Sequence, residues 1–415
     1  MSDVPPYDVA VVGAGAAGLM AAISAAEAGA RVLLLEKTAR PGVKILMSGG
    51  TRCNLTHACD DRGIVTAYGP PGRFLHSALA AFGVQDAIDF FEAEGVATKV
   101  EETGKIFPVS NKAADVVAAL LARLRRTDAA LTLESPLLRL EAGFALVTPR
   151  QTYRAARVIL TTGGKSYPGS GTTGDGYALT QAFGHTIVPP RPALVPITVD
   201  MPWVSELRGI TLPDIGARVV EGDKVLMARR GSLLFAHFGL TGPVILDISR
   251  VVSGHPAPRT RRVELDLRPD ESLPHLDERI RVETAAEGKK LLAAVLAVWM
   301  PRRLAEGVLA QAGLPLDRRA AALSKPERTR LVEACKRLPM PVSGTLGFGR
   351  AEVTAGGVTL EEVDSRTMQS KLVPGLYLAG ELLDLDGPIG GYNFQAAWST
   401  GWLAGLKAVT GVTSF

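Results

Sequence analysis

The sequence predicts an α/β protein in which a Rossmann-like dinucleotide-binding domain is interrupted by an insert of a small β-barrel and a helical subdomain. Three observations predict this fold. An apolar strand at residues 8–12 runs directly into Gly-x-Gly-x-x-Gly at 13–18. Prolines cluster at residues 188–192, where the sequence pattern changes. A second apolar strand, ending in Gly-Glu at 380–381, returns to the first pattern near the C-terminus.

The N-terminal segment contains a complete βαβ unit. Gly13 permits a tight turn, Gly15 lets the backbone approach a pyrophosphate, and Gly18 brings the helix against the strand. The helix expected over residues 19–28 offers backbone N–H groups and its positive dipole end to phosphates. Glu36 follows the second strand at the spacing of a carboxylate that binds a ribose 2′-hydroxyl, which favours FAD or NAD over NADP.

Length and composition indicate two or three globular domains in 415 residues, of which 47% are hydrophobic and 21% charged. The 46 Lys and Arg against 42 Asp and Glu give no argument for a nucleic-acid or membrane partner. Residues 1–6 lack the features of a signal peptide, and no apolar run is long enough to span a bilayer. The three cysteines form no disulfide framework. We therefore expect a soluble cytoplasmic protein without a metal site.

A polar, glycine-dense segment follows the second strand at residues 41–57. Such segments persist where backbone must approach a ligand, although an ordinary surface loop is the alternative. Lys44, Arg52 and Asn54 would supply cationic and amide donors. Cys53 and Cys59 raise the question of a redox pair, but their C-x5-C spacing is wider than that of redox motifs, so we expect ordinary thiols.

The next part of the chain, to residue 183, predicts helices, a short strand and a β-meander. Helices are expected within 72–94, 110–125 and 177–183, and a strand at 105–109. The meander would have strands at 130–134, 137–141, 144–148 and 152–155. A strand in residues 157–164 then brings Thr162 and Gly163 to a ligand edge, before a second glycine-rich loop at 165–176.

The pattern of predicted secondary structure changes between residues 191 and 343. Residues 197–267 alternate short β-like runs with Gly and Pro turns, which is typical of a small barrel. Residues 276–338 have a helical pattern. The predicted domains are therefore 1–190 with 344–415 for the dinucleotide-binding domain, 191–275 for the barrel and 276–343 for the helical part.

The C-terminal segment distinguishes FAD from NAD. A strand ending in Gly380 and Glu381 is followed by a glycine turn at 387–391 that opens a helix. The acid would accept hydrogen bonds from ribityl hydroxyls, and the helix N-terminus would face the pyrimidine edge of the isoalloxazine. NAD is too short to explain this second site, so we predict non-covalent FAD. NAD(P)H would act only as a transient co-substrate, because only one Gly-x-Gly-x-x-Gly, at 13–18, directly follows an apolar strand.

With these residues in view, the chain resembles the aminoacetone oxidase-like flavoproteins, a family of FAD-dependent oxidoreductases that also includes a flavoprotein of bile-acid 7-dehydroxylation. The resemblance covers essentially the whole chain. Besides 13–18 it rests on ordered motifs at 44–54, 163–176, 237–243, 353–358, 367–371 and 390–395. It implies a Rossmann-like FAD domain interrupted by a barrel and a helical part. Two positions depart from the family pattern, since Thr51 replaces a Gly and His57 replaces an Asn.

The predicted cofactor-binding residues lie along both halves of the dinucleotide-binding domain: Gly13, Gly15, Ala16, Gly18, Glu36, Lys37, Lys44, Gly49, Arg52, Asn54, Leu137, Thr162, Gly163, Gly380, Glu381, Gly391, Tyr392 and Asn393. The sequence does not identify the catalytic residues. Candidates on the substrate side are Cys53, His57, Tyr167, His237 and Tyr392. Each has a structural alternative, because His237 in an apolar run suits a core imidazole and the tyrosines would equally pack against the cofactor.

We expect an FAD-dependent oxidoreductase that transfers a hydride between a small organic substrate, such as an amine, and flavin N5. Oxygen or another acceptor would complete the cycle. Three alternatives stay open: an NAD(P)H-dependent flavin reductase of a small unsaturated substrate, an RNA-associated flavoprotein and a non-catalytic flavin-binding protein. RNA is the less expected partner, because acids dilute the arginines of residues 302–337, as on a solvated helical face. The sequence leaves the oligomeric state open.

Overall fold

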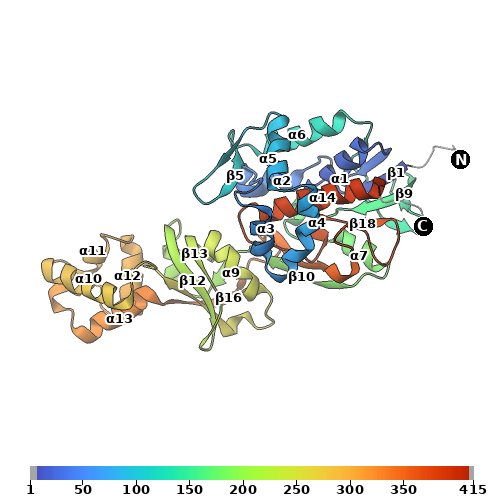
Figure 1. Ribbon diagram of the computed structural model, residues 1–415. Helices are drawn as coiled ribbons and strands as arrows, with labels where there is room; N and C mark the ends of the chain where they lie inside the picture. The colour runs from blue at the N-terminus through green and yellow to red at the C-terminus, as the bar shows by residue number, and fades with distance from the viewer. Residues whose placement is uncertain (1–6, 411–415) are drawn as a thin grey trace. The chain divides into compact units, whose positions relative to one another are not determined.

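The computed structural model describes residues 7–410, which divide into two units (Figure 1). One unit contains the chain up to Pro192 and from Ala351 onwards, and the other contains Ala193–Arg350. Each unit has its own hydrophobic core. Residues 1–6, on which the signal-peptide expectation rests, lie outside the described residues.

A parallel sheet forms the centre of the first unit. Its strand order is β6-β2-β1-β9, and β18 pairs with the C-terminal half of β9. The strands are β1 (Tyr7–Val12), β2 (Val32–Leu35), β6 (Ala130–Thr132), β9 (Thr152–Leu160) and β18 (Leu376–Leu378). Residues 9–12 of β1, all of β2 and residues 158–160 of β9 are Val, Ile, Leu and Ala and are buried, as expected of a parallel sheet covered on both faces.

The predicted β-meander is wrong in its topology. β6 pairs in parallel with β2, and only β7 (Arg139–Glu141) and β8 (Ala145–Val147) run antiparallel beside β9. β9 continues from residue 152 to 160 without a break. The first half of β9 is partly exposed and its second half is buried. The hydrophobic pattern therefore changes within this one strand, and the sequence predicted two separate strands in its place.

Helices α1 (Ala16–Glu27) and α14 (Tyr392–Thr410) lie side by side in the first unit (Figure 1). A Cβ atom at Gly401 would lie 2.2 Å from the carbonyl oxygen of Ala17, and one at Gly405 would lie 2.3 Å from that of Ala21. The two helices therefore approach too closely for any side chain at these positions. This contact joins the N-terminal and C-terminal segments of the dinucleotide-binding domain.

The remaining elements of this unit surround the sheet. Its helices are α2 (Val43–Met47), α3 (Asp61–Tyr68), α4 (His76–Ala81), α5 (Val84–Ala93), α6 (Ala113–Arg125) and α7 (Asp175–Gln181), of which α2 and α3 were not predicted. Two smaller sheets consist of β3 (Thr56–His57), β5 (Lys105–Pro108) and β4 (Thr98–Val100), and of β10 (Ile187–Ala193) and β17 (Val353–Val358).

A closed six-stranded barrel is the core of the second unit, as the sequence predicted. The strand order is β11-β14-β13-β12-β15-β16, with β11 (Ile197–Val199), β12 (Thr211–Glu221), β13 (Lys224–Ala236), β14 (Gly239–Thr241), β15 (Arg261–Asp266) and β16 (Leu338–Thr345). Outside it lie α8 (Pro202–Glu206), α9 (Pro243–Ser253), α10 (Leu273–Ala286), α11 (Leu292–Leu296), α12 (Arg302–Gln311) and α13 (Lys325–Lys336). Helices α10–α13 gather together, as Figure 1 shows.

Two details of this unit differ from the expectation. α9 lies inside the segment that was predicted to form strands. Its Val, Ile and Leu residues favour a strand, but Pro243 occupies the first helical position, where proline favours the start of a helix. The segment expected to be helical ends at Lys336, and β16 closes the barrel. Pro339 and Pro341 obscured β16 in the sequence, although Leu338, Met340 and Val342 alternate on its buried face.

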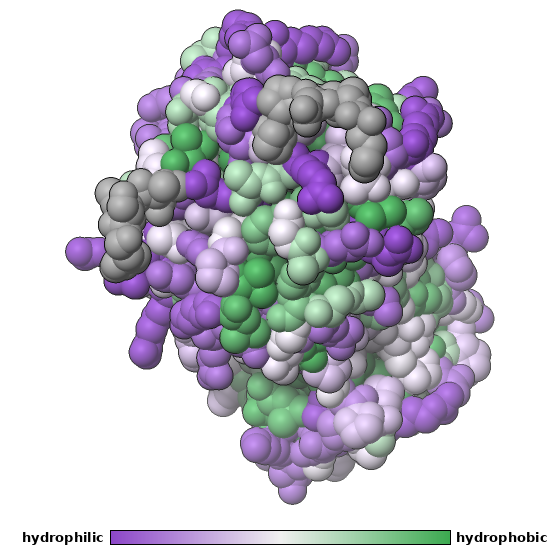
Figure 2. Space-filling model, turned by 90° about the vertical axis from the view of Figure 1, so that its right-hand side faces the viewer, coloured by the Kyte–Doolittle hydropathy of each residue, from purple (hydrophilic) through white to green (hydrophobic). Residues whose placement is uncertain are grey.

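The face displayed in Figure 2 carries many polar side chains, with hydrophobic residues visible between them. Among residues 7–410, no helix has the length and apolar character needed to cross a membrane.

Candidate functional site

Four parallel strands end in register at one edge of the main sheet. Val12 pairs with Leu35 and with Leu160, and Leu160 pairs with Leu378. The loops after these strands begin at Gly13, Glu36, Thr161 and Ala379, so four segments from distant parts of the sequence meet at the carboxyl edge. Ligands of open parallel sheets bind at this edge.

The glycine turn after β1 has the geometry that its sequence predicted. Gly13 has a φ of 99°, and a Cβ atom at Gly18 would lie 1.7 Å from the Gly13 carbonyl oxygen. A Cβ atom at Gly15 would meet nothing within 4 Å, so open space lies in front of that residue. Ala16 begins α1, whose first turn contains no acidic residue. The turn therefore offers room and a positive helix end to a pyrophosphate.

The Thr162 hydroxyl is packed against α7, because a Cβ atom at Gly176 would lie 2.0 Å from its oxygen. It is buried and has no hydrogen-bond partner in the part of the chain that the structure describes. It follows Thr161, whose own hydroxyl donates to the carbonyl oxygens of Val12 and Gly13 at 2.9 and 3.0 Å. The Thr162 hydroxyl is therefore covered by the protein itself, and the open space at Gly15 is the feature of this edge that fits the pyrophosphate of FAD.

Glu36 is fixed by three donors at the end of β2. One carboxylate oxygen accepts from the Ala14 N–H at 2.8 Å, and the other accepts from the N–H and hydroxyl of Thr38, both at 2.8 Å. A carboxylate has about four acceptor positions, so about one is left for a ribose hydroxyl. Leu137 is half-buried in the segment after β6, close in the chain to Ser135, whose N–H donates to the Glu36 carbonyl oxygen.

Lys37 connects this end of the site to the second glycine-rich loop. Its ammonium donates to the Thr173 hydroxyl at 2.7 Å and forms an ion pair with Asp175. The side chain of Asp175 also accepts from the Thr173 hydroxyl. The structure thus joins the end of β2 to the loop that precedes α7.

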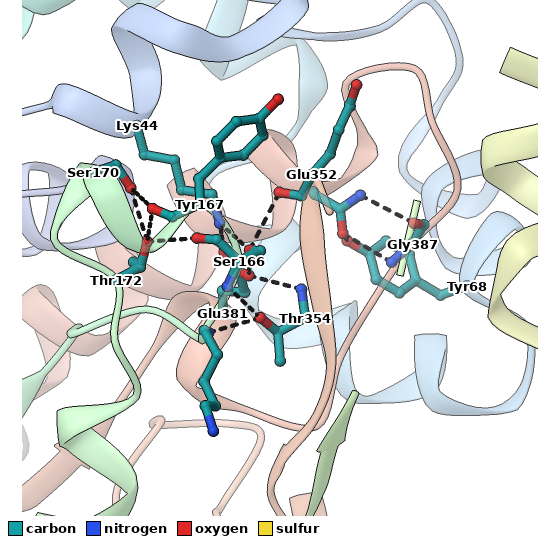
Figure 3. Close-up of polar contacts among 12 residues, drawn as sticks. Lys44, Tyr68, Ser166, Tyr167, Ser170, Thr172, Glu352, Thr354, Glu381 and Gly387 are labelled. Carbon is teal, nitrogen blue, oxygen red and sulfur yellow. Dashed lines mark hydrogen bonds and ion pairs between the residues drawn. The ribbon is translucent and has the colours of Figure 1, made fainter. Parts of the chain in front are cut away.

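Glu381, after β18, lies in a second polar network (Figure 3). One carboxylate oxygen accepts from the Ser166 hydroxyl at 2.7 Å and from the Thr354 N–H at 2.8 Å. The other oxygen forms an ion pair with Lys44, whose ammonium also donates to Ser166 at 2.7 Å. The structure therefore brings together Lys44 and Glu381, two residues that the sequence predicted at the cofactor.

The turn before α14 packs against β3. The Nδ1–H of His57 donates to the Gly390 carbonyl oxygen at 3.0 Å, and the His57 ring stacks on Tyr392 with centroids 4.6 Å apart. The Asn54 amide, oriented to satisfy its neighbours, accepts from the Gly391 N–H at 2.9 Å. Asn393 exchanges two hydrogen bonds with the backbone of Gly387, at 2.8 and 3.0 Å. The turn that would meet the flavin is thus rigidly held.

Three non-glycine residues near these loops have left-handed backbone conformations. The φ angles are 69° at Thr51, 59° at Cys53 and 51° at Tyr167. Such conformations are costly and persist mostly where function or the surroundings impose them. Gly49 has a φ of 55° in the same loop, and Arg52 is turned towards the β4–β5 hairpin, with its guanidinium 4.0 Å from the Phe107 ring centroid and 2.7 Å from Glu101.

A family model for the HI0933-like protein Rossmann domain matches residues 7–407. The chain belongs to this family. The HI0933-like chain is 35% identical to the ribosomal RNA dihydrouridine synthase of Escherichia coli, over 98% of this chain and 99% of that protein. It is 33% identical to the 3-dehydro-bile acid delta(4,6)-reductase of Clostridium scindens, over 96% and 98%. These matches confirm the predicted resemblance, and the protein is an enzyme of the FAD-dependent oxidoreductase class.

Solved structures share the fold of this HI0933-like chain. The 3-ketosteroid-delta4-(5alpha)-dehydrogenase of Rhodococcus jostii RHA1 has a TM-score of 0.51 at 17% identity, covering 98% of this chain and 97% of that one. The open conformation of a flavocytochrome c3 fumarate reductase has a TM-score of 0.50 at 17% identity, covering 98% and 79%. At such identities the likeness establishes the fold alone, and it confirms the predicted class.

The catalytic candidates have different surroundings in this HI0933-like enzyme. Burial raises the pKa of the Cys53 thiol to about 12, so it is almost wholly protonated at neutral pH. Burial and the neighbouring Asp60 and Asp61 also raise the pKa of Cys59. His237 lies in the other unit and is exposed beside Phe238, which contradicts its reading as a core imidazole. Tyr167 points away from the Glu381 network in Figure 3.

Sequence reasoning missed Ser166 and Thr354 as functional residues. Both lie inside motifs that carry the family resemblance, at 163–176 and 353–358. No sequence signal separates them from other buried hydroxyl residues, since their roles depend on contacts with Glu381, 215 and 27 residues away in the chain.

Replacing Thr51 by Gly should stabilise the protein by about 1 kcal/mol. A left-handed conformation costs a residue with a side chain about 1–2 kcal/mol, and the entropy that glycine loses on folding offsets part of this gain. Urea unfolding of Thr51→Gly and of the control Thr51→Ala measures the effect, and Ala should give a smaller gain because it keeps a Cβ. A Thr51→Gly protein no more stable than the natural one would contradict the strain argument.

Proposed function

We propose that this enzyme reduces a carbon–carbon double bond conjugated to a carbonyl group, with FAD as its hydride carrier. One observation carries this proposal: two relatives of 35% and 33% identity, each matched over nearly the full chain, have unlike substrates but names that describe the same type of reaction. Making dihydrouridine from uridine and reducing a delta(4,6) steroid both saturate a ring double bond. This favours the reductive alternative over oxidation of an amine.

The fit of FAD to the first unit supports this proposal. Gly13, Gly15 and the start of α1 would hold the pyrophosphate, Glu36 the adenosine ribose and Glu381 the ribityl chain. FAD supplies a hydride from its reduced N5 atom when it is bound. In this proposal NAD(P)H reduces it as a transient co-substrate. Binding is non-covalent in this proposal, and the location is the cytoplasm.

The uracil ring of ribosomal RNA is the first substrate to test. A second relative named ribosomal RNA dihydrouridine synthase, from Haemophilus influenzae, is 33% identical over 96% of this chain. The second unit has 24 Lys and Arg against 18 Asp and Glu, whereas the rest of the chain has 22 against 24. A net positive unit suits a polyanion.

Ion pairs in the helical part weaken the charge argument for RNA binding but do not remove it. Several of the cations that suggested RNA are paired with acids: Arg302 with Glu306, Arg318 with Glu327, Arg328 with Asp277 and Lys336 with Asp266. The positive excess therefore comes from other Lys and Arg residues of the unit. A 3-oxo steroid with conjugated double bonds is the second substrate to test.

The test is an anaerobic assay with pre-reduced enzyme. Ribosomal RNA from a strain that lacks the gene, a 3-oxo-delta(4,6) steroid and a panel of primary amines would be offered in parallel. We expect flavin reoxidation with RNA and mass-spectrometric gain of two hydrogens on one uridine. Reoxidation by the steroid alone would assign the second substrate class. Failure of both, together with bleaching of oxidised flavin by an amine, would overturn the reductase proposal.

A further inference from the structure

The Glu381 carboxylate has most of its acceptor positions filled by the protein. Ser166, the Thr354 N–H and Lys44 supply the three donors, and the Glu381 side chain is 19% exposed. About one acceptor position is left for a bound group. The direction of that remaining position is set by the residues that hold the other three. The orientation of Glu381 is therefore decided by its neighbours as much as by its own backbone.

Thr354 holds this arrangement at two points. Its backbone N–H binds Glu381, and its hydroxyl accepts from the N–H groups of Lys165 and Ser166 at 2.8 and 3.0 Å. Thr354 is fully buried on β17. A Cβ atom at Gly164 would lie 2.4 Å from the Thr354 hydroxyl oxygen, so the loop approaches β17 as closely as it does because that residue is glycine. The Thr354 hydroxyl thus fixes the backbone that carries Ser166.

We propose that Thr354 and Ser166 are positioning residues for Glu381, and that through it they set the affinity and the electronic environment of the flavin. Neither residue need touch the cofactor for this effect. Thr354 orders the segment 164–166, Ser166 then bridges Lys44 and Glu381, and Lys44 keeps a positive charge beside the carboxylate (Figure 3). The proposal rests on FAD binding at Glu381 and is independent of the substrate.

Thr354→Val removes the hydroxyl while keeping a branched side chain and the backbone N–H. It leaves the N–H groups of Lys165 and Ser166 without their acceptor, so the loop should shift and Ser166 should lose its place against Glu381. Thr354→Ser retains the acceptor and should restore the natural behaviour. Thr284→Val is the matched control, because the buried Thr284 hydroxyl donates to carbonyl groups of its own helix in the second unit, and residues 7–410 offer it no other hydrogen bond.

The experiment measures FAD affinity, the absorption spectrum of bound flavin and its reduction potential, together with the melting temperature of each apoprotein. We expect Thr354→Val to bind FAD about tenfold more weakly, with shifted absorption bands and potential, and Thr354→Ser to bind within about twofold of the natural protein. Thr284→Val should alter the melting temperature alone. If Thr354→Val does not fold, Ser166→Ala provides the same readouts.

Three results would overturn the proposal. The first is unchanged flavin affinity, spectrum and potential in Thr354→Val or Ser166→Ala. The second is a loss in Thr354→Ser as large as that in Thr354→Val, which would assign the effect to packing of the threonine methyl group. The third is an equal loss of affinity in Thr284→Val, which would indicate general destabilisation. None of these readouts uses a substrate, so they are separate from a failure of the reductase assay.

Discussion

Gly15→Val should yield a folded protein that is purified without FAD. A side chain at residue 15 has open space in the protein itself, since no atom lies within 4 Å of the position of its Cβ. That space is where a pyrophosphate would approach the turn, so the valine methyl groups should exclude it. We expect at least about a hundredfold loss of affinity, equivalent to about 2.8 kcal/mol. Titration of the apoprotein with FAD, followed by flavin fluorescence, measures the loss.

Substitutions at two other glycines serve as comparisons for Gly15→Val. Gly349→Val is the control in open space, because its Cβ would also meet nothing within 4 Å, and it should leave FAD binding unchanged. Gly18→Ala should instead fail to fold, because its Cβ would lie 1.7 Å from the Gly13 carbonyl oxygen. A Gly15→Val protein that binds FAD normally would refute the placement of the pyrophosphate at this turn.

Replacing Glu36 and Glu381 separately should distinguish the two ends of the cofactor. Glu36→Ala should weaken FAD binding by about 1.5–3 kcal/mol, the contribution of a hydrogen bond to a charged group, without changing the spectrum of bound flavin. Glu381→Ala should weaken binding similarly and also shift the absorption bands or reduction potential, because this carboxylate and the start of α14 would lie beside the flavin ring. Isothermal titration and spectroelectrochemistry of both variants measure these effects.

Glu36→Gln is the matched variant for the adenosine end. The Glu36 carboxylate also accepts from the buried Ala14 N–H, so Glu36→Ala should lower stability as well as affinity. Gln retains an acceptor for that N–H and should lose affinity with little loss of stability. Identical spectra and potentials for the Glu36 and Glu381 variants would show that the flavin ring lies away from Glu381, against the loop at residues 48–54.

The sequence by itself determined the glycine turn after β1 and the existence of the insert, and it predicted the second half-site. Each depends on residues close together in the chain: three glycines and an acid in one βαβ unit, a strand ending in Gly380-Glu381, and prolines at 188–192. Local periodicity and turn chemistry are sufficient for such features. Local periodicity and turn chemistry did not predict β16, because its prolines are unusual in a strand. They also did not predict the pairing of β6, because its parallel partner β2 lies about a hundred residues earlier.

Only the tertiary structure decided which polar groups form hydrogen bonds or ion pairs with each site residue. Lys44, Ser166, Thr354 and Glu381 meet because β9, β17 and β18 and the segment around α2 fold to one edge. The same packing buries Cys53 and raises the pKa of its thiol, and it turns Arg52 towards Glu101. Chain periodicity contains no information about these contacts, because hydrogen-bond partners and burial depend on distances between segments that are far apart in sequence.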